Sequence, residues 1–143
     1  MRAGLPDHVE ARVSAWCEAR GIELCYLYGS RARGSARADS DYDLAVRFSA
    51  PVSADERDAL LADLQESVAR SLGLPETRVD VHDLDEMPLA LQYRVLRDGV
   101  RMRESPPGAH ARFYVRVLGE YLDFRYYEEM HLGRMRDRVR EGR

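Results

Sequence analysis

Two aspartates separated by one residue are the side chains in this sequence best placed to act together chemically. Asp41 and Asp43 stand at the start of a segment, residues 42–48, that has the composition of a strand. Because side chains alternate along a strand, both carboxylates should point to one face and Tyr42 to the other. Two such carboxylates repel each other unless a cation lies between them, and oxygen ligands of this kind suit Mg²⁺. The pair therefore predicts a magnesium site.

A third aspartate can complete this site from the next predicted strand, residues 78–84. Asp80 lies there between two valines, and a neighbouring strand would bring its carboxylate beside the first two. Three carboxylates can hold two metal ions about 3.5–4 Å apart, the arrangement used for in-line phosphoryl transfer. Asp83 and Asp85 lie close by and leave the choice of the third acid open.

A glycine-serine pair upstream of the acids has the features of a polyphosphate site. Gly29 lets the backbone approach a phosphate closely, and the N–H groups of a following helix start can bind anions. The Ser30 hydroxyl adds a donor. Arg31, Arg33 and Arg37 are near enough in sequence to line the same turn and to neutralise phosphate charge, although the sequence does not tell which of them faces inward.

This arrangement resembles the signature of the polymerase-β-like nucleotidyltransferase superfamily, and in particular its minimal single-domain members. The resemblance covers about residues 20–104 and rests on a Gly-Ser pair followed, after ten residues, by Asp-x-Asp. It implies that pyrophosphate leaves and that Asp80 is a candidate base. It further implies the following site residues: Asp41, Asp43 and Asp80 as catalytic ligands of two Mg²⁺ ions, and Gly29 and Ser30 as binders of the triphosphate.

Within that superfamily the chain looks like the MntA antitoxins of HepT–MntA toxin–antitoxin systems. The similar features are its small size, the Gly-Ser-Arg-Ala-Arg-Gly run at residues 29–34 and a long C-terminal helix rich in Tyr and Arg. The resemblance implies transfer of AMP from ATP to a tyrosine hydroxyl of a partner HEPN-type ribonuclease toxin, in a hetero-oligomer that silences the toxin.

Three other functions are compatible with the same acids. A nucleotidyltransferase acting on a small-molecule hydroxyl would share them, but 143 residues leave little room for a second domain to hold that acceptor. A two-metal nuclease would share them without needing the Gly-Ser pair. An antitoxin that only binds its partner would need none of them for neutralisation.

The elements that must position these residues can be read from hydrophobic periodicity and from breaker residues. Their order indicates an α+β protein, an α/β sandwich in which helices flank a small mixed sheet. We expect a minimal nucleotidyltransferase domain over residues 1–104 and a C-terminal helical extension over 105–143 that docks a partner. The expected elements are a helix from Asp7 to Arg20 capped by Asp7, strands at 22–28 and 42–48, a helix from a capping box at Ser53 to about Leu72, a strand at 78–84, a helix at 88–98, a strand at 100–103 and a long helix beyond Gly108.

Composition narrows the classes of function. All 22 Lys-plus-Arg residues are Arg, so lysine-dependent phosphate loops and Schiff-base chemistry are excluded. The net charge of −3 does not favour direct nucleic-acid binding. No apolar run approaches the roughly 20 residues of a membrane span and no export signal is apparent, so we expect a cytoplasmic protein.

Overall fold

The strands of the protein form one four-stranded mixed sheet in the computed structural model, which describes residues 4–142. The strand order is β3-β2-β1-β4; β1 pairs antiparallel with β2 and with β4, whereas β2 and β3 are parallel. The elements in chain order are α1 (Asp7–Ala19), β1 (Ile22–Tyr28), α2 (Ser30–Arg33), β2 (Tyr42–Phe48), α3 (Ala54–Leu72), η1 (Glu76–Arg78), β3 (Val79–Asp83), η2 (Leu84–Glu86), α4 (Leu89–Asp98), β4 (Val100–Glu104) and α5 (Ala109–Arg140).

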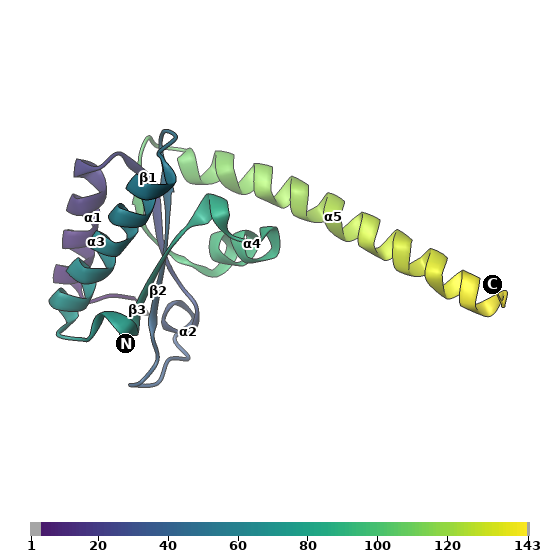
Figure 1. Ribbon diagram of the computed structural model, residues 1–143, viewed down its shortest axis with the longest axis horizontal. Helices are drawn as coiled ribbons and strands as arrows, with labels where there is room; N and C mark the ends of the chain where they lie inside the picture. The colour runs from purple at the N-terminus through teal and green to yellow at the C-terminus, as the bar shows by residue number, and fades with distance from the viewer. Residues whose placement is uncertain (1–3, 143) are drawn as a thin grey trace.

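Helices cover both faces of the sheet (Figure 1). On one face, α1 and α3 bury apolar side chains such as Val13 and Leu64 against Leu44 of β2. On the other face, α4 and the first turns of α5 pack around Tyr26 of β1, with Val95 among the buried residues. The predicted sandwich with helices on a small mixed sheet is confirmed.

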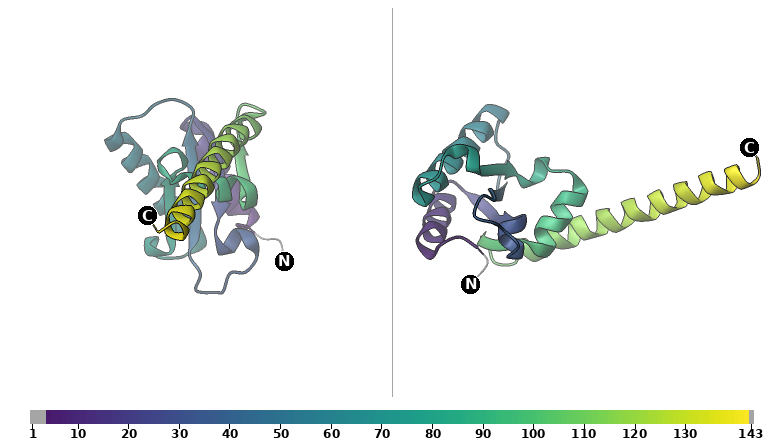
Figure 2. Two further views of the ribbon diagram at one scale, coloured as in Figure 1. Left: turned by 90° about the vertical axis from the view of Figure 1, so that its right-hand side faces the viewer. Right: turned by 90° about the horizontal axis from the view of Figure 1, so that it is seen from below.

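Helix α5 is much longer than its packing surface. It has 32 residues, but its buried residues, Ala109, Phe113 and Val117, all lie in its first third. Beyond α4 the helix projects away from the rest of the molecule (Figures 1 and 2). Its apolar side chains there, including Phe124 and Met135, are 56% and 49% exposed. None of the helices within residues 4–142 has an apolar stretch that could cross a membrane.

Most element boundaries follow the sequence patterns, with two local differences. The capping box is present, because the Ser53 hydroxyl accepts a 3.2 Å hydrogen bond from the Glu56 N–H. The expectation that Asp7 caps the first helix is wrong: Pro6 occupies the N-cap position and Asp7 lies in the first turn. The segment after Gly29, expected only as a turn, forms the single-turn helix α2.

Candidate active site

Three polar side chains form a row across neighbouring strands. Tyr28 at the end of β1 pairs in register with Asp43 of β2, and Asp43 pairs with Asp80 of β3. Directly paired residues project to the same face of a sheet. The structure thus brings Asp43 and Asp80 together on the face covered by α4, as alternation along the strands indicates.

The two alternatives to Asp80 lie elsewhere. Asp83 pairs in register with Val46, is only 9% exposed and accepts a 3.0 Å hydrogen bond from the backbone N–H of Asp85. The Asp85 carboxylate forms ion pairs with Arg47 at 3.2 Å and Arg116 at 3.8 Å. Neither is paired with Asp43, so Asp80 is the acid that the sheet places beside it.

Asp43 lies in an environment that disfavours its negative charge. Burial of the carboxylate raises its pKa, the charges of Asp80 and then Asp41 raise it further, and His82 lowers it. Mutual repulsion among carboxylates held by the backbone is the condition that a bound cation relieves.

Asp41 is placed differently from the other two acids. It precedes β2, is exposed, and its Oδ1 lies 3.2 Å from Nε of Arg78. The guanidinium of Arg78 also donates to the backbone carbonyls of Ala38 and Ser40, at 3.1 and 3.0 Å. Arg78 therefore ties Asp41 and its preceding loop to the start of β3.

The carboxylates match a hard cation in chemistry but are not yet gathered around one point. Among residues 4–142 no three His, Cys, Asp or Glu side chains are arranged closely enough to hold a metal ion. Asp43 and Asp80 supply oxygen ligands from adjacent strands. For Asp41 to join them, its carboxylate must turn away from Arg78.

Gly29, the residue before Ser30, lies directly beside Asp43. Gly29 has φ +74°, and a Cβ built on it would lie 2.6 Å from Oδ2 of Asp43. Only glycine fits both the left-handed φ and the close approach. The N–H groups of Ala32 and Arg33 donate to the Gly29 carbonyl at 3.2 Å, which starts α2 at Ser30. Glycine at this position therefore lets the backbone of the turn lie next to the Asp43 carboxylate.

The three arginines of this region have different surroundings. Arg31 donates to the carbonyls of Ala38 and Ser40, at 3.3 and 2.8 Å, and its guanidinium lies 4.2 Å from the ring centroid of Tyr42. It supports the same loop as Arg78. Arg33 lines a cavity beside Gly29, and Arg37 is exposed. The role of each in phosphate binding stays a prediction, with Arg33 the best placed.

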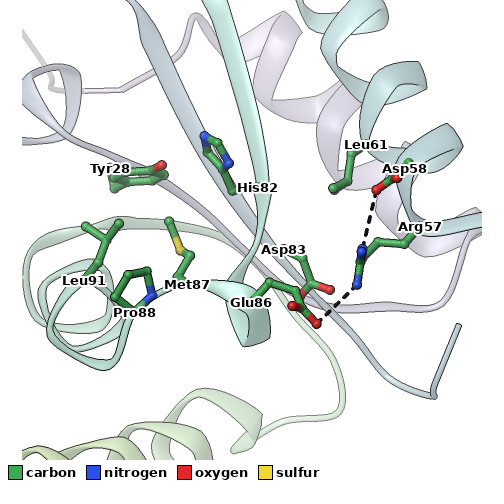
Figure 3. Close-up of a pocket in the computed structure, with 10 residues that line it drawn as sticks. All are labelled: Tyr28, Arg57, Asp58, Leu61, His82, Asp83, Glu86, Met87, Pro88 and Leu91. Carbon is green, nitrogen blue, oxygen red and sulfur yellow. Dashed lines mark ion pairs between the residues drawn. The ribbon is translucent and has the colours of Figure 1, made fainter. Parts of the chain in front are cut away.

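Two cavities flank Tyr28. The smaller, about 150 Å³, adjoins the glycine turn and is lined by Tyr28, Gly29, Ala32, Arg33, Leu91, Arg94, Val95, Asp98 and Gly99. The larger, about 400 Å³, extends between α3 and α4 (Figure 3) and is lined by Tyr28, Arg57, Asp58, Leu61, His82, Asp83, Glu86, Met87, Pro88 and Leu91.

Sequence reasoning missed Tyr28, Arg78 and His82 as residues of this site. Burial, and then the charges of Asp43 and Asp80, raise the pKa of the Tyr28 phenol, so it stays protonated beside the carboxylates. Alternation does put His82 on the face of Asp80, but a lone histidine is more often structural, so the sequence prediction leaves it out. Alternation could also have found Tyr28, which shares a face with an acid of the row. No sequence signal distinguishes Arg78 from the other arginines.

Comparison with known proteins identifies both a family and a group of similar folds. Residues 13–106 match the family described as "Polymerase beta, Nucleotidyltransferase". A chain of a toxin–antitoxin complex with AMP-PNP has a TM-score of 0.69 and 20% identity, over 88% of this chain and 97% of that chain. A chain of an MntA–HepT toxin–antitoxin complex has a TM-score of 0.65 and 18% identity, over 91% and 98%.

A third similar chain comes from a complex of tri-AMPylated Shewanella oneidensis HEPN toxin with MNT antitoxin. It has a TM-score of 0.63 and 18% identity, over 90% of this chain and 96% of that chain. At such identities the likeness establishes the fold. No curated protein matches the sequence.

Proposed function

This chain belongs to the polymerase-β nucleotidyltransferase family, and from that premise we propose that it transfers AMP from ATP to a tyrosine hydroxyl of a partner HEPN-type ribonuclease toxin, thereby acting as its antitoxin. The observation that carries the proposal is the placement of Asp43 and Asp80 side by side against the Gly29-Ser30 turn. A carboxylate pair next to an open phosphate-binding turn is what nucleotidyl transfer requires.

The reaction is a single displacement at the α-phosphorus of ATP. The acceptor oxygen forms a bond to that phosphorus while the bond to the bridging oxygen of pyrophosphate breaks, and pyrophosphate leaves with the electron pair. The carboxylate of Asp80 accepts the acceptor's proton. Backbone N–H groups after Gly29, the Ser30 hydroxyl and Arg33 bind the negative charge of the leaving group.

Asp41, Asp43 and Asp80 are the residues that would hold Mg²⁺, two ions in this proposal. Bound Mg²⁺ supplies neutralisation of phosphate charge and orientation of the α-phosphate. The chain's own contribution is to hold Asp43 and Asp80 in register and to keep Asp41 near them on the loop that Arg31 and Arg78 support.

The projecting part of α5 favours a protein as the partner of this chain. The side of the helix that buries Phe113 and Val117 continues past the domain as an apolar stripe, formed by Phe124, Leu132, Met135 and Val139. Such a stripe on a helix with no surface beside it fits an amphipathic docking element. We therefore keep residues 1–104 as the catalytic domain and 105–143 as its docking extension.

The likeness to three toxin–antitoxin structures favours a HEPN-type partner over a small-molecule acceptor. One of those complexes holds AMP-PNP, and another contains a tri-AMPylated HEPN toxin. ATP availability places the reaction in the cytoplasm, and the proposal requires neither membrane nor direct nucleic-acid binding.

The intact mass of the partner tests this function. The HEPN-type partner is incubated with the chain, ATP and Mg²⁺, and we expect it to gain one or more AMP units. Asp43→Asn should abolish the gain, whereas Asp39→Asn, which changes an exposed loop acid, should leave it intact. If the partner gains no mass, or if Asp43→Asn neutralises the toxin as well as wild type does, occlusion by binding replaces catalysis as the explanation.

A further inference from the structure

The larger cavity beside Tyr28 has walls suited to an aromatic side chain. Leu61 of α3, Met87 ahead of α4 and Leu91 within α4 supply its apolar surface, and the Tyr28 ring closes one side (Figure 3). Its volume of about 400 Å³ is sufficient for one side chain of the size of tyrosine. Apolar and aromatic walls with a few polar groups are the usual lining of a specific binding pocket.

The charges at this cavity disfavour the polyphosphate of ATP. Three acids, Asp58, Asp83 and Glu86, line it together with one arginine, Arg57, and with His82. Arg57 is already paired with Glu86 at 3.2 Å and with Asp58 at 3.6 Å. The residues proposed to bind phosphate, Gly29 and Arg33, line only the smaller cavity, which adjoins the larger one at Tyr28 and Leu91. The larger cavity is therefore left for a neutral group.

The order of residues across the sheet adds a directional argument. The Gly29-Ser30 turn follows β1, Asp43 lies on β2 in the middle, and Asp80 lies on the edge strand β3. In an in-line displacement the attacking oxygen and the leaving group lie on opposite sides of the phosphorus. If pyrophosphate lies at the β1 side, the acceptor must approach from the β3 side. The larger cavity extends from Tyr28 of β1 to that side, where His82 and Asp83 of β3 line it.

We propose that this cavity receives the acceptor side chain, a tyrosine phenol of the partner, with its hydroxyl directed toward Asp43 and Asp80. This inference rests on the proposed function and adds where the acceptor binds and why it is a tyrosine. The phenol ring contacts Met87 and Leu91 on the face of the sheet that carries the two acids, Leu61 closes the cavity from the other side of β3, and the acidic rim faces the partner's backbone. A serine would leave those apolar walls uncovered, so tyrosine is preferred by burial of apolar surface.

Pocket-filling variants of the full-length chain test the assignment. Leu61→Trp fills the wall, and Asp58→Trp blocks the mouth from a side chain that is 72% exposed, so it does not endanger folding. Ala62→Trp is the matched control, because Ala62 is exposed on the same helix and lines neither cavity. Leu61→Met conserves volume and serves as a second control.

Three quantities are measured for each variant. They are kcat/KM for AMP transfer to the partner toxin, the Kd of α,β-methylene-ATP by calorimetry, and binding of N-acetyl-L-tyrosinamide by saturation-transfer NMR. We expect both pocket-filling variants to lose at least about tenfold in kcat/KM and to lose the tyrosinamide signal, while the nucleotide Kd stays within about twofold. Ala62→Trp and Leu61→Met should match wild type.

Two outcomes overturn the inference. Unchanged transfer and tyrosinamide binding in both pocket-filling variants would show that the acceptor binds elsewhere. An equal loss of nucleotide binding would assign the cavity to the adenine base instead. Failure of the proposed function is distinguishable, because a wild-type chain that transfers no AMP to the partner still reports on the cavity through tyrosinamide binding.

Discussion

A side chain at Gly29 would occupy the position of the Asp43 carboxylate: a Cβ built there lies 2.6 Å from Asp43 Oδ2. Gly29 also has φ +74° and ψ −156°, a conformation that L-residues rarely adopt. The turn that we propose binds phosphate thus lies so close to Asp43 that any side chain at position 29 would displace the carboxylate.

Gly29→Ala should therefore inactivate the protein more than backbone strain alone explains. We expect AMP transfer to fall at least about 100-fold, because a displacement of roughly 1 Å in a reacting group has that effect. Gly34→Ala is the matched control: Gly34 also has positive φ, +72°, but a Cβ there meets nothing within 4 Å. Gly34→Ala should lose about 1–2 kcal/mol of unfolding free energy through its left-handed backbone, and Gly29→Ala should lose more because the clash with Asp43 is added. Equal activities in the two variants would contradict the steric argument.

Asp80→Asn, compared with Asp85→Asn, should identify which acid is the third one of the site. We expect AMP transfer to fall at least about 100-fold. Thermal stability should change little, because the negative charges of Asp80 and Asp43 repel each other in the folded protein and the substitution removes no favourable ion pair between them. Asp85→Asn removes ion pairs with Arg47 and Arg116 instead, so it should retain transfer. Initial rates and melting curves of both variants check this. If only Asp85→Asn loses transfer, the third acid is Asp85 of η2 and not Asp80.

Arg78 should compete with Mg²⁺ for Asp41. Arg78→Gln removes an ion pair to Asp41 and hydrogen bonds to two loop carbonyls, whereas Arg31→Gln removes hydrogen bonds to the same carbonyls and a contact with the Tyr42 ring but no ion pair to Asp41. We expect Arg78→Gln to need roughly 1.5- to 5-fold less Mg²⁺ for half-maximal transfer than Arg31→Gln, the factor that corresponds to about 0.2–1 kcal/mol for a partly exposed ion pair. Equal Mg²⁺ requirements would show that the ion pair does not restrain Asp41.

Local sequence patterns were sufficient to predict the strands of the sheet that carry the site. The apolar runs of β1 and β2 ended at the expected residues, since each is bounded by a breaker or a polar turn. Alternation along β2 and β3 then indicated that Asp43 and Asp80 could share a face, as they do. These inferences needed only the period of a strand and one neighbouring strand.

Other parts of the site depend on contacts that no local pattern contains. Arg78 reaches Asp41 across 37 positions of the chain, and this pairing requires the parallel register of β2 and β3. The larger cavity requires α3 and α4 to be placed on either side of β3. Periodicity predicted helix α5 but not that most of it would extend past the domain, because an apolar stripe does not reveal what covers it.

Acidification should weaken the packing of α5 through His110. Its Nδ1 and the Tyr26 hydroxyl share a hydrogen bond of 2.6 Å, and its ring stacks near Tyr114. Burial, and then the charge of Arg101, lower the pKa of His110, although Glu104 opposes this. The unfolded chain therefore binds the proton at His110 more readily than the folded chain does. The contribution of neutral His110 to folding stability is present above the unfolded pKa of about 6.5 and is lost as pH falls through the lower folded pKa.

Thermal melts between pH 8 and pH 5 check this dependence. The melting temperature of the wild type should decline below about pH 6.5, and His110→Gln should show a smaller decline over the same range. His131→Gln is the control, because His131 is exposed on the projecting part of α5. A wild-type slope retained in full by His110→Gln would assign the pH dependence to other groups.

Truncation after Asp123 should separate folding from partner docking. The shortened chain keeps the buried residues Phe113 and Val117, and Tyr121, whose ring stacks on Tyr93 at 4.3 Å. We therefore expect its melting temperature and its affinity for α,β-methylene-ATP to match the full-length chain. Binding of the HEPN-type partner, measured by calorimetry, should weaken at least about 100-fold because the apolar stripe is removed.

Point variants in the full-length chain make the same test without shortening the helix. Leu132→Ser combined with Met135→Ser changes two members of the stripe, each 49% exposed, and should weaken partner binding. Arg134→Ser combined with Arg138→Ser changes two exposed residues between and beyond them and should have a smaller effect at moderate salt. If the truncated chain binds the partner as tightly as the full-length chain does, the docking surface lies on the catalytic domain, and the projecting helix must have a different partner.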